Sequence, residues 1–97
     1  MAFKSADPIT WNFAFSDEAK DNFKKLDKPV QLRIKKKIEQ IMSGKINPTL
    51  FFKRLSGNAS YLHSMRIGDY RLIATIDDNK WVIVTIHIGH RKDVYNF

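Results

Sequence analysis

Hydrophobic and polar positions alternate along residues 10–15, the first patterned stretch of the chain. Trp11, Phe13 and Phe15 fall on one side of this stretch, and the residues between them are polar or small. A period of two with aromatic rings on one face is typical of a half-buried β-strand. The pattern therefore predicts a first strand over residues 10–15.

Two stretches with helical spacing follow this strand. Ser16 is a typical helix N-cap residue, and acidic residues come directly after it, where the helix dipole favours them. The second stretch has Pro29 in its first turn and ends at Gly44. The apolar stripes of the two stretches consist of Ala19, Phe23 and Leu26, and of Val30, Ile34, Ile38 and Ile41. We therefore expect a helical hairpin.

The second half of the chain returns to strand patterns. Residues 61–67, 70–76 and 81–88 each read as a strand, and turn-forming residues separate them. Residues 77–80, with the sequence DDNK, predict a hairpin loop. The last run is almost entirely apolar, which is expected of a strand at the centre of a sheet.

The element order β-α-α-β-β-β predicts an α+β fold, in which an N-terminal helical hairpin packs on a mostly antiparallel, twisted sheet. With 97 residues, the chain is expected to form one domain over residues 1–97. It has no cysteine, which excludes disulfides and thiolate metal sites. We see no signal-peptide core and no apolar run near the roughly 20 residues that cross a bilayer. The expected location is the cytoplasm, with no membrane partner.

The charge balance narrows the classes of partner. Seventeen Lys and Arg residues face ten Asp and Glu residues, which gives a formal net charge of +7. A small domain this basic attracts polyanions through the release of counterions. Nucleic acid, a ribosome, an anionic membrane and an acidic protein all fit this charge, and net charge alone does not choose among them.

Three arginines frame the last predicted strands. Arg66 ends one strand, Arg71 begins the next after a tight turn, and Arg91 comes just after the last strand. Each guanidinium offers a planar fork of donors that matches a phosphate group. The grouping therefore predicts a phosphate site, and solvated arginines at strand ends are the alternative interpretation.

Two residues beside Arg91 can move protons. Cleavage of a phosphodiester by transesterification needs a proton acceptor, a proton donor and stabilisation of negative charge. His90 is a typical proton carrier near neutral pH. Tyr95 gains phenolate character among arginines and can also stack on an RNA base. The alternative interpretations are a loop histidine and an aromatic anchor for the C-terminus.

Further basic residues are candidates for contacts with an RNA backbone. Lys53 and Arg54 come just before the last three strands, and Lys35 and Lys36 belong to the basic run at residues 33–37. A solvated helix face is the alternative for that run.

The remaining histidines give weaker signals. His63 can face either side of its strand, where it is a candidate RNA contact. His87 lies within an apolar run and is interpreted as a hydrogen-bonded sheet residue. The histidines have no carboxylate or thiolate support at a recognised zinc spacing, so we expect no metal site and no cofactor.

The run KRLSGNASYLHSMRIGDYRLIATIDDNKWVIVTIHIGHRKDVY resembles the RelE branch of the RelE/ParE toxin superfamily. The pieces that carry the resemblance are RIGDYRLI, the IDD hairpin and IGHRKDVY. The resemblance implies a compact sheet with two N-terminal helices, and the toxin half of a type II toxin–antitoxin pair. RelE-type toxins enter the ribosomal A site and cut the mRNA there without a metal. The implied partners are a cognate antitoxin and the 70S ribosome with its mRNA.

The resemblance also implies roles for individual residues. Arg71 and Arg91 match two catalytic arginines, and Tyr95 matches a tyrosine that stacks on the mRNA and acts in proton transfer. Arg66 matches a basic position in the preceding strand, and His90 lies where many relatives carry a basic residue or histidine.

One departure concerns Ser64, where relatives often carry Lys or Arg. It weakens the proton-transfer machinery unless His63, His90 or Lys53 compensates. A catalytically inactive RelE-fold binding protein is therefore one alternative function. A ParE-like toxin that inhibits DNA gyrase by binding is the other, against which the C-terminal Arg and Tyr set argues.

Overall fold

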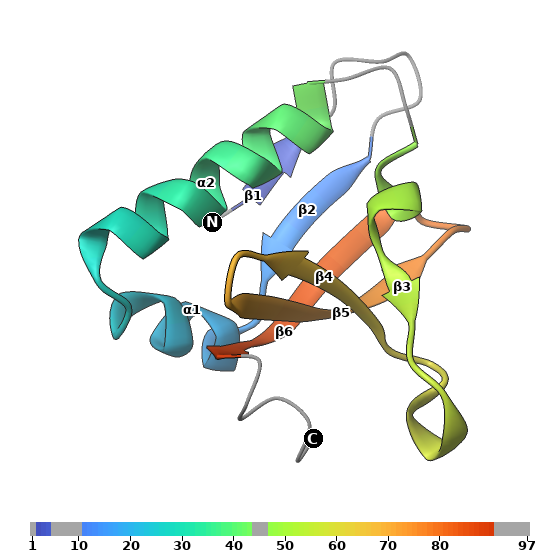
Figure 1. Cartoon of the computed structure of the whole chain (residues 1–97). Coiled ribbons are helices and arrows are strands. Elements are labelled where there is room, and N and C mark those ends of the chain that lie inside the picture. The colour runs from blue at the N-terminus through green and yellow to red at the C-terminus, as the bar shows by residue number, and fades with distance from the viewer. Residues whose placement is uncertain (1, 5–10, 44–46, 91–97) are drawn as a thin grey trace.

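The computed structural model describes residues 2–4, 11–43 and 47–90 of the chain. Two helices and a six-stranded sheet make up most of this part (Figure 1). The elements in chain order are β1 (Ala2–Lys4), β2 (Asn12–Phe15), α1 (Asp17–Lys24), α2 (Lys28–Ser43), the 3₁₀ helix η1 (Pro48–Phe51), β3 (Lys53–Arg54), the 3₁₀ helix η2 (Gly57–Ala59), β4 (His63–Ile67), β5 (Tyr70–Asp77) and β6 (Val82–His90).

The strands follow the order β1-β2-β6-β5-β4-β3 across the sheet. All neighbouring strands are antiparallel except β2 and β6, which are parallel. The predicted α+β class, the mostly antiparallel sheet and the position of β6 inside the sheet are confirmed. The short strands β1 and β3, with three and two residues, were not predicted, because such short segments show no measurable alternation.

Five strand boundaries differ from the prediction. β5 ends at Asp77 rather than at residue 76, and β6 ends at His90 rather than at residue 88, so His90 belongs to the strand and not to a loop. β2 begins at Asn12 rather than at residue 10, and residue 10 lies outside the described residues. β4 begins at His63 rather than at residue 61, because the Leu55 amide bonds the Leu62 carbonyl and closes a loop there. β6 begins after Trp81, whose φ of +57° belongs to the hairpin turn.

Both predicted helices form, but α1 ends at Lys24, before Leu26 of its predicted apolar stripe. The Ser16 hydroxyl caps α1 by accepting from the Ala19 amide at 3.1 Å, which confirms the predicted N-cap. In α2 the predicted stripe is buried at Ile34, Ile38 and Ile41. The helix ends at Ser43, and Gly44, its predicted end, lies outside the described residues.

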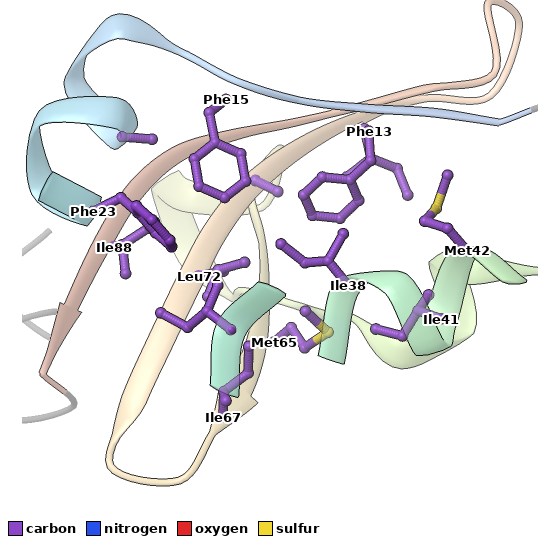
Figure 2. Close-up of a cluster of buried hydrophobic side chains, with 14 of the residues drawn as sticks. Phe13, Phe15, Phe23, Ile38, Ile41, Met42, Met65, Ile67, Leu72 and Ile88 are labelled. Carbon is purple, nitrogen blue, oxygen red and sulfur yellow. The ribbon is translucent and has the colours of Figure 1, made fainter. Parts of the chain in front are cut away.

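The sheet has two different faces. The core face packs against α2, and Figure 2 shows its aromatic and aliphatic side chains meeting those of the helix. It carries Phe13, Phe15, Met65, Ile67, Leu72, Ala74, Ile83 and Ile88. Side chains alternate along a strand, so the residues between these belong to the opposite face. We call that face the arginine face, and define it by Ser64, Arg66, Arg71, Ile73 and His87.

A β-bulge in β6 changes which residues reach each face. Ile73 pairs with His87, whereas the next residue, Ala74, pairs with Thr85, so Ile86 is an extra residue. Thr85 and Ile88 are both buried, at 0% and 3% exposure. The bulge therefore turns Ile86 and His87 towards the arginine face, where Ile86 packs against Ile73.

Where β2 ends, helix α1 lies beside β6 and supplies hydrogen-bond partners to its backbone (Figure 1). The Ser16 amide donates to the Thr85 carbonyl at 2.8 Å, and the Ser16 hydroxyl donates to the Ile86 carbonyl at 3.3 Å. The Ile88 amide then donates to the Asn22 side-chain oxygen at 3.0 Å. One capping residue and one amide side chain thus extend the hydrogen bonding of the strand past the end of β2.

Candidate active site

Two arginines face each other across the β4–β5 hairpin. Arg66 and Arg71 are direct register partners, and one tight turn joins their strands. Direct partners have Cα atoms about 4.5–5.5 Å apart and share one face. Gly68 allows the turn, because its φ of +59° is a conformation that other residues rarely adopt. The Arg66 Nε donates to the Gly68 carbonyl at 3.2 Å, so the turn also orients this guanidinium.

The arginine face holds two parallel rows of residues. In the first row Arg66 pairs with Arg71, and Arg71 pairs with Gly89 of β6, which brings no side chain. In the second row Lys53, Ser64, Ile73 and His87 pair in that order, from β3 to β6. On this face, the row with the arginine pair therefore ends at Gly89, which has no side chain. The neighbouring row has Lys53 at one end and His87 at the other.

The charge on this face is suited to an anion. Lys53 and Arg66 are both exposed, and Arg71 is half-buried, with its Nε shielded from solvent. Among the described residues, neither Lys53 nor Arg66 makes an ion pair with a carboxylate. Cations that the register of a sheet holds close together can donate charge-assisted hydrogen bonds to phosphate oxygens.

His90 lies on the other face. It is the register partner of Tyr70, and the two rings meet edge to face, with centroids 5.5 Å apart. Tyr70 alternates with Arg71 along β5, so Tyr70 and His90 belong to the core face. The structure therefore separates the imidazole of His90 from the Arg66–Arg71 pair by the thickness of the sheet.

Arg54 and His63 line a pocket at the β3–β4 edge. They are register partners on the core face, and the pocket has a volume of about 260 Å³. Burial lowers the pKa of His63 below its ordinary value of 6.5, and the nearby Arg54 charge lowers this pKa further. Asp78 acts in the opposite direction. The other lining residues are Thr49, Phe52, Ile76 and Asp78.

The two candidate lysines of α2 lie on the helical side of the molecule. Lys35 and Lys36 are exposed, and the Lys35 Nζ lies 5.8 Å from the centroid of the Phe23 ring. They do not join the arginine face. The candidates Arg91 and Tyr95 lie outside the described residues.

Two residues near the arginines were not predicted as parts of a site. His87 reaches the arginine face because of the β6 bulge, and its Nδ1 lies 3.3 Å from the Glu18 carboxylate. Arg33 of α2 reaches the β4–β5 turn, where its Nη1 lies 3.0 Å from the position that a Cβ at Gly68 would take. The interpretation of His87 as a hydrogen-bonded sheet residue agrees with its contact to Glu18.

Residues 2–4, 11–43 and 47–90 contain no cluster of three or more His, Asp or Glu residues that could hold a metal ion. None of the helices in these ranges is long and apolar enough to cross a membrane.

A family model described as "ParE toxin of type II toxin-antitoxin system, parDE" matches residues 13–95. An Escherichia coli protein described as a RelE-like toxin is 29% identical over 91 residues, which cover 91% of this chain and 93% of that protein. The toxin RelE of Mycobacterium tuberculosis is 41% identical over 49 residues, which are half of each chain.

Solved structures give the same assignment. The toxin of the RelBE2 toxin–antitoxin complex of Mycobacterium tuberculosis aligns with a TM-score of 0.65 and 25% identity, over 84% of this chain and 91% of that chain. The isolated Escherichia coli RelE toxin aligns with a TM-score of 0.59 and 27% identity, over 87% and 89% of the two chains. These matches confirm the resemblance. The chain belongs to the RelE/ParE family of toxins of type II toxin–antitoxin systems.

Proposed function

We propose that this toxin is an endoribonuclease that cuts mRNA in the A site of the ribosome and so stops translation. The observation that carries the proposal is the register pairing of Arg66 with Arg71 on the open side of the sheet. Two guanidiniums on neighbouring strands can bind different oxygens of one phosphate.

The proposed reaction is an in-line transesterification. The 2′-oxygen attacks the adjacent phosphorus, the bond to the 5′-oxygen breaks, and the products are a 2′,3′-cyclic phosphate and a 5′-hydroxyl. Arg71 and Arg91 stabilise the charge that builds up on the phosphorane oxygens, and Arg66 holds the scissile phosphate. The ribosome holds the mRNA in the reactive geometry, which can supply several kcal/mol of the barrier.

Other candidates have supporting roles in this proposal. Tyr95 accepts the proton of the 2′-hydroxyl and stacks on a base, as the resemblance implies. Lys53 is the register partner of Ser64, so it lies on the neighbouring strand directly opposite the position where relatives carry Lys or Arg. Arg54, His63, Lys35 and Lys36 remain predicted RNA contacts away from the scissile phosphate. Since His90 belongs to the core face, we do not assign the proton transfer to it.

The test is translation of a defined mRNA in a purified system, with the mRNA 5′ ends mapped by primer extension. We expect cuts in A-site codons when ribosomes are present. A ribosome-free control with naked mRNA in EDTA should show no cuts. Arg71→Ala should lower the cleavage rate by about 10²–10³-fold, the typical effect of removing one charge-stabilising donor. Its fold should stay intact, because Arg71 belongs to no core cluster.

Lys80→Ala is the matched control, because Lys80 is an exposed cation in the β5–β6 turn, at the other end of β5. This variant should cleave at the wild-type rate. Normal cleavage by a folded Arg71→Ala protein would refute the proposed site. Ribosome-independent cleavage, or no cleavage, would refute the proposed function.

We also propose a cognate antitoxin as partner. Several of the similar structures are RelB–RelE complexes, including those of Mycobacterium tuberculosis and Escherichia coli. With its net charge of +7, this chain would attract an acidic segment that folds when it binds. Co-expression with the protein encoded next to the toxin gene, followed by co-purification and neutralisation of cleavage, tests the partner.

Inhibition of DNA gyrase is the second candidate function, because the matching family model is described by its ParE members. A supercoiling assay with purified gyrase separates the two. Inhibition that survives in Arg71→Ala, without mRNA cleavage, would favour this candidate.

A further inference from the structure

The bulge in β6 brings a histidine to the row beside the arginine pair. His87 pairs with Ile73, and Arg71 lies two residues before Ile73 on the same side of β5. Same-face diagonal neighbours across two strands are about 7–8 Å apart between backbone positions, which is within reach of an imidazole and a guanidinium. Without the bulge, alternation from buried Thr85 would turn His87 into the core. Bulges are frequent beside active sites, where they re-aim a side chain.

Helix α1 orients this imidazole. The Nδ1 atom of His87 lies 3.3 Å from a carboxylate oxygen of Glu18, in the first turn of α1. An ionised carboxylate can only accept, so the contact is a hydrogen bond when Nδ1 carries the proton. In catalytic sites, a carboxylate that holds one ring nitrogen of a histidine in this way orients the other nitrogen for proton exchange with a substrate. The His87 side chain is 26% exposed, so solvent can restore its proton after each turnover.

We propose that His87 is a catalytic residue of this toxin, the general acid that protonates the leaving 5′-oxygen, and that Glu18 is its positioning residue. This inference rests on the proposed ribonuclease function. As the bond from phosphorus to the 5′-oxygen breaks, Nε2–H gives its proton to that oxygen. The imidazolium becomes neutral imidazole and keeps its Nδ1–H on Glu18. The proton of the 2′-hydroxyl leaves separately, to the acceptor on the other side of the phosphorus.

The other two histidines do not fit this role. His63 and His90 both belong to the core face, with Arg54 and Tyr70 as their register partners. His87 and Ser64 lie in the same row, as the two register partners of Ile73. The histidine therefore supplies a proton donor in the row where this chain has Ser64 instead of a basic residue.

The test compares the cleavage rates of two substrates that differ in the leaving atom at the scissile phosphate, oxygen or sulfur. Single-turnover cleavage on ribosomes is measured with an ordinary mRNA and with an mRNA that carries sulfur in place of the 5′-oxygen at the cut. A thiolate leaves without a proton, so only the oxygen substrate needs a general acid. His87→Gln should slow the oxygen substrate by about 10²-fold or more, and should cleave the sulfur substrate at close to the wild-type rate.

Glu18→Gln should give a smaller loss, again on the oxygen substrate only. The matched control is Asp17→Asn, which removes an exposed carboxylate from the same first turn and should leave both rates unchanged. Thermal unfolding of each variant checks the fold.

A wild-type rate of His87→Gln on the oxygen substrate would overturn the inference, and so would an equal loss on both substrates, which indicates a structural role. Those outcomes leave the ribonuclease function in place. Absence of cleavage by the wild-type protein on both substrates would refute that function and the inference together.

Discussion

The hydrogen bond between Asn22 and the Ile88 amide tests how α1 holds β6. Asn22→Ala removes the acceptor that the Ile88 N–H reaches at 3.0 Å. Ile88 is 3% exposed, so water does not readily replace that acceptor. A buried donor without a partner costs about 1–3 kcal/mol. Alanine in place of asparagine recovers about 0.6 kcal/mol of helix propensity in α1. The expected net loss is about 1.5 kcal/mol.

Urea and thermal unfolding measure this loss. For a domain of this size, 1.5 kcal/mol corresponds to a decrease in Tm of about 6–12 °C. The matched control is Asp21→Ala, which makes the same gain in propensity at an exposed position next to Asn22. The Asp21→Ala protein should be as stable as the wild type or slightly more stable, whereas the Asn22→Ala protein should be less stable. Asn22→Asp keeps an acceptor oxygen and should retain most of the stability.

Hydrogen exchange locates the effect. The Ile88 amide should lose protection in Asn22→Ala and keep it in Asn22→Asp. Equal stability of the Asn22→Ala and Asp21→Ala proteins would refute the reasoning. Unchanged protection of the Ile88 amide would do so as well, because it would mean that another group satisfies this N–H.

Two further predictions concern buried polar groups. Thr85 is fully buried, and its hydroxyl has no hydrogen-bond partner among the described residues. Thr85→Val should therefore raise the free energy of unfolding, measured in urea, by about 1 kcal/mol. A lower free energy of unfolding would contradict this prediction. Because burial lowers the pKa of His63 in the folded state, the unfolded chain binds more protons as pH falls through 6.5, and wild-type stability falls there. His63→Gln should lose less stability than the wild type between pH 8 and pH 5, and equal losses would rule out this coupling.

The sequence predicts the part of the candidate site that depends on local structure. The Arg66–Arg71 pair needs only a tight turn at Gly68 and alternation along two adjacent strands. Both features are readable within six residues. For the same reason, the buried stripes of α1 and α2 and the central position of β6 agree with their patterns.

The sequence does not show which face each histidine occupies. In β6 the extra residue Ile86 shifts the alternation, so His87 and Ile88 exchange faces relative to an unbroken strand. Nothing in the apolar run of β6 marks Ile86 as the bulge. The sequence also does not predict the approach of Arg33 to Gly68, because this contact depends on how α2 lies across the sheet.

The two parts of the candidate site therefore rest on different interactions. The arginine pair is held by its own hairpin. His87 depends instead on two contacts between distant segments: Ser16 with the Ile86 carbonyl, 70 positions apart, and Glu18 with His87 itself, 69 positions apart. In the proposed mechanism, the arginine pair can bind phosphate once the hairpin has formed, but the proposed acid is in place only when α1 is docked on β6. Loss of that docking should consequently leave an RNA-binding protein that cleaves poorly. The hydrogen bonds that α1 makes to β6 would then contribute to catalysis as well as to stability.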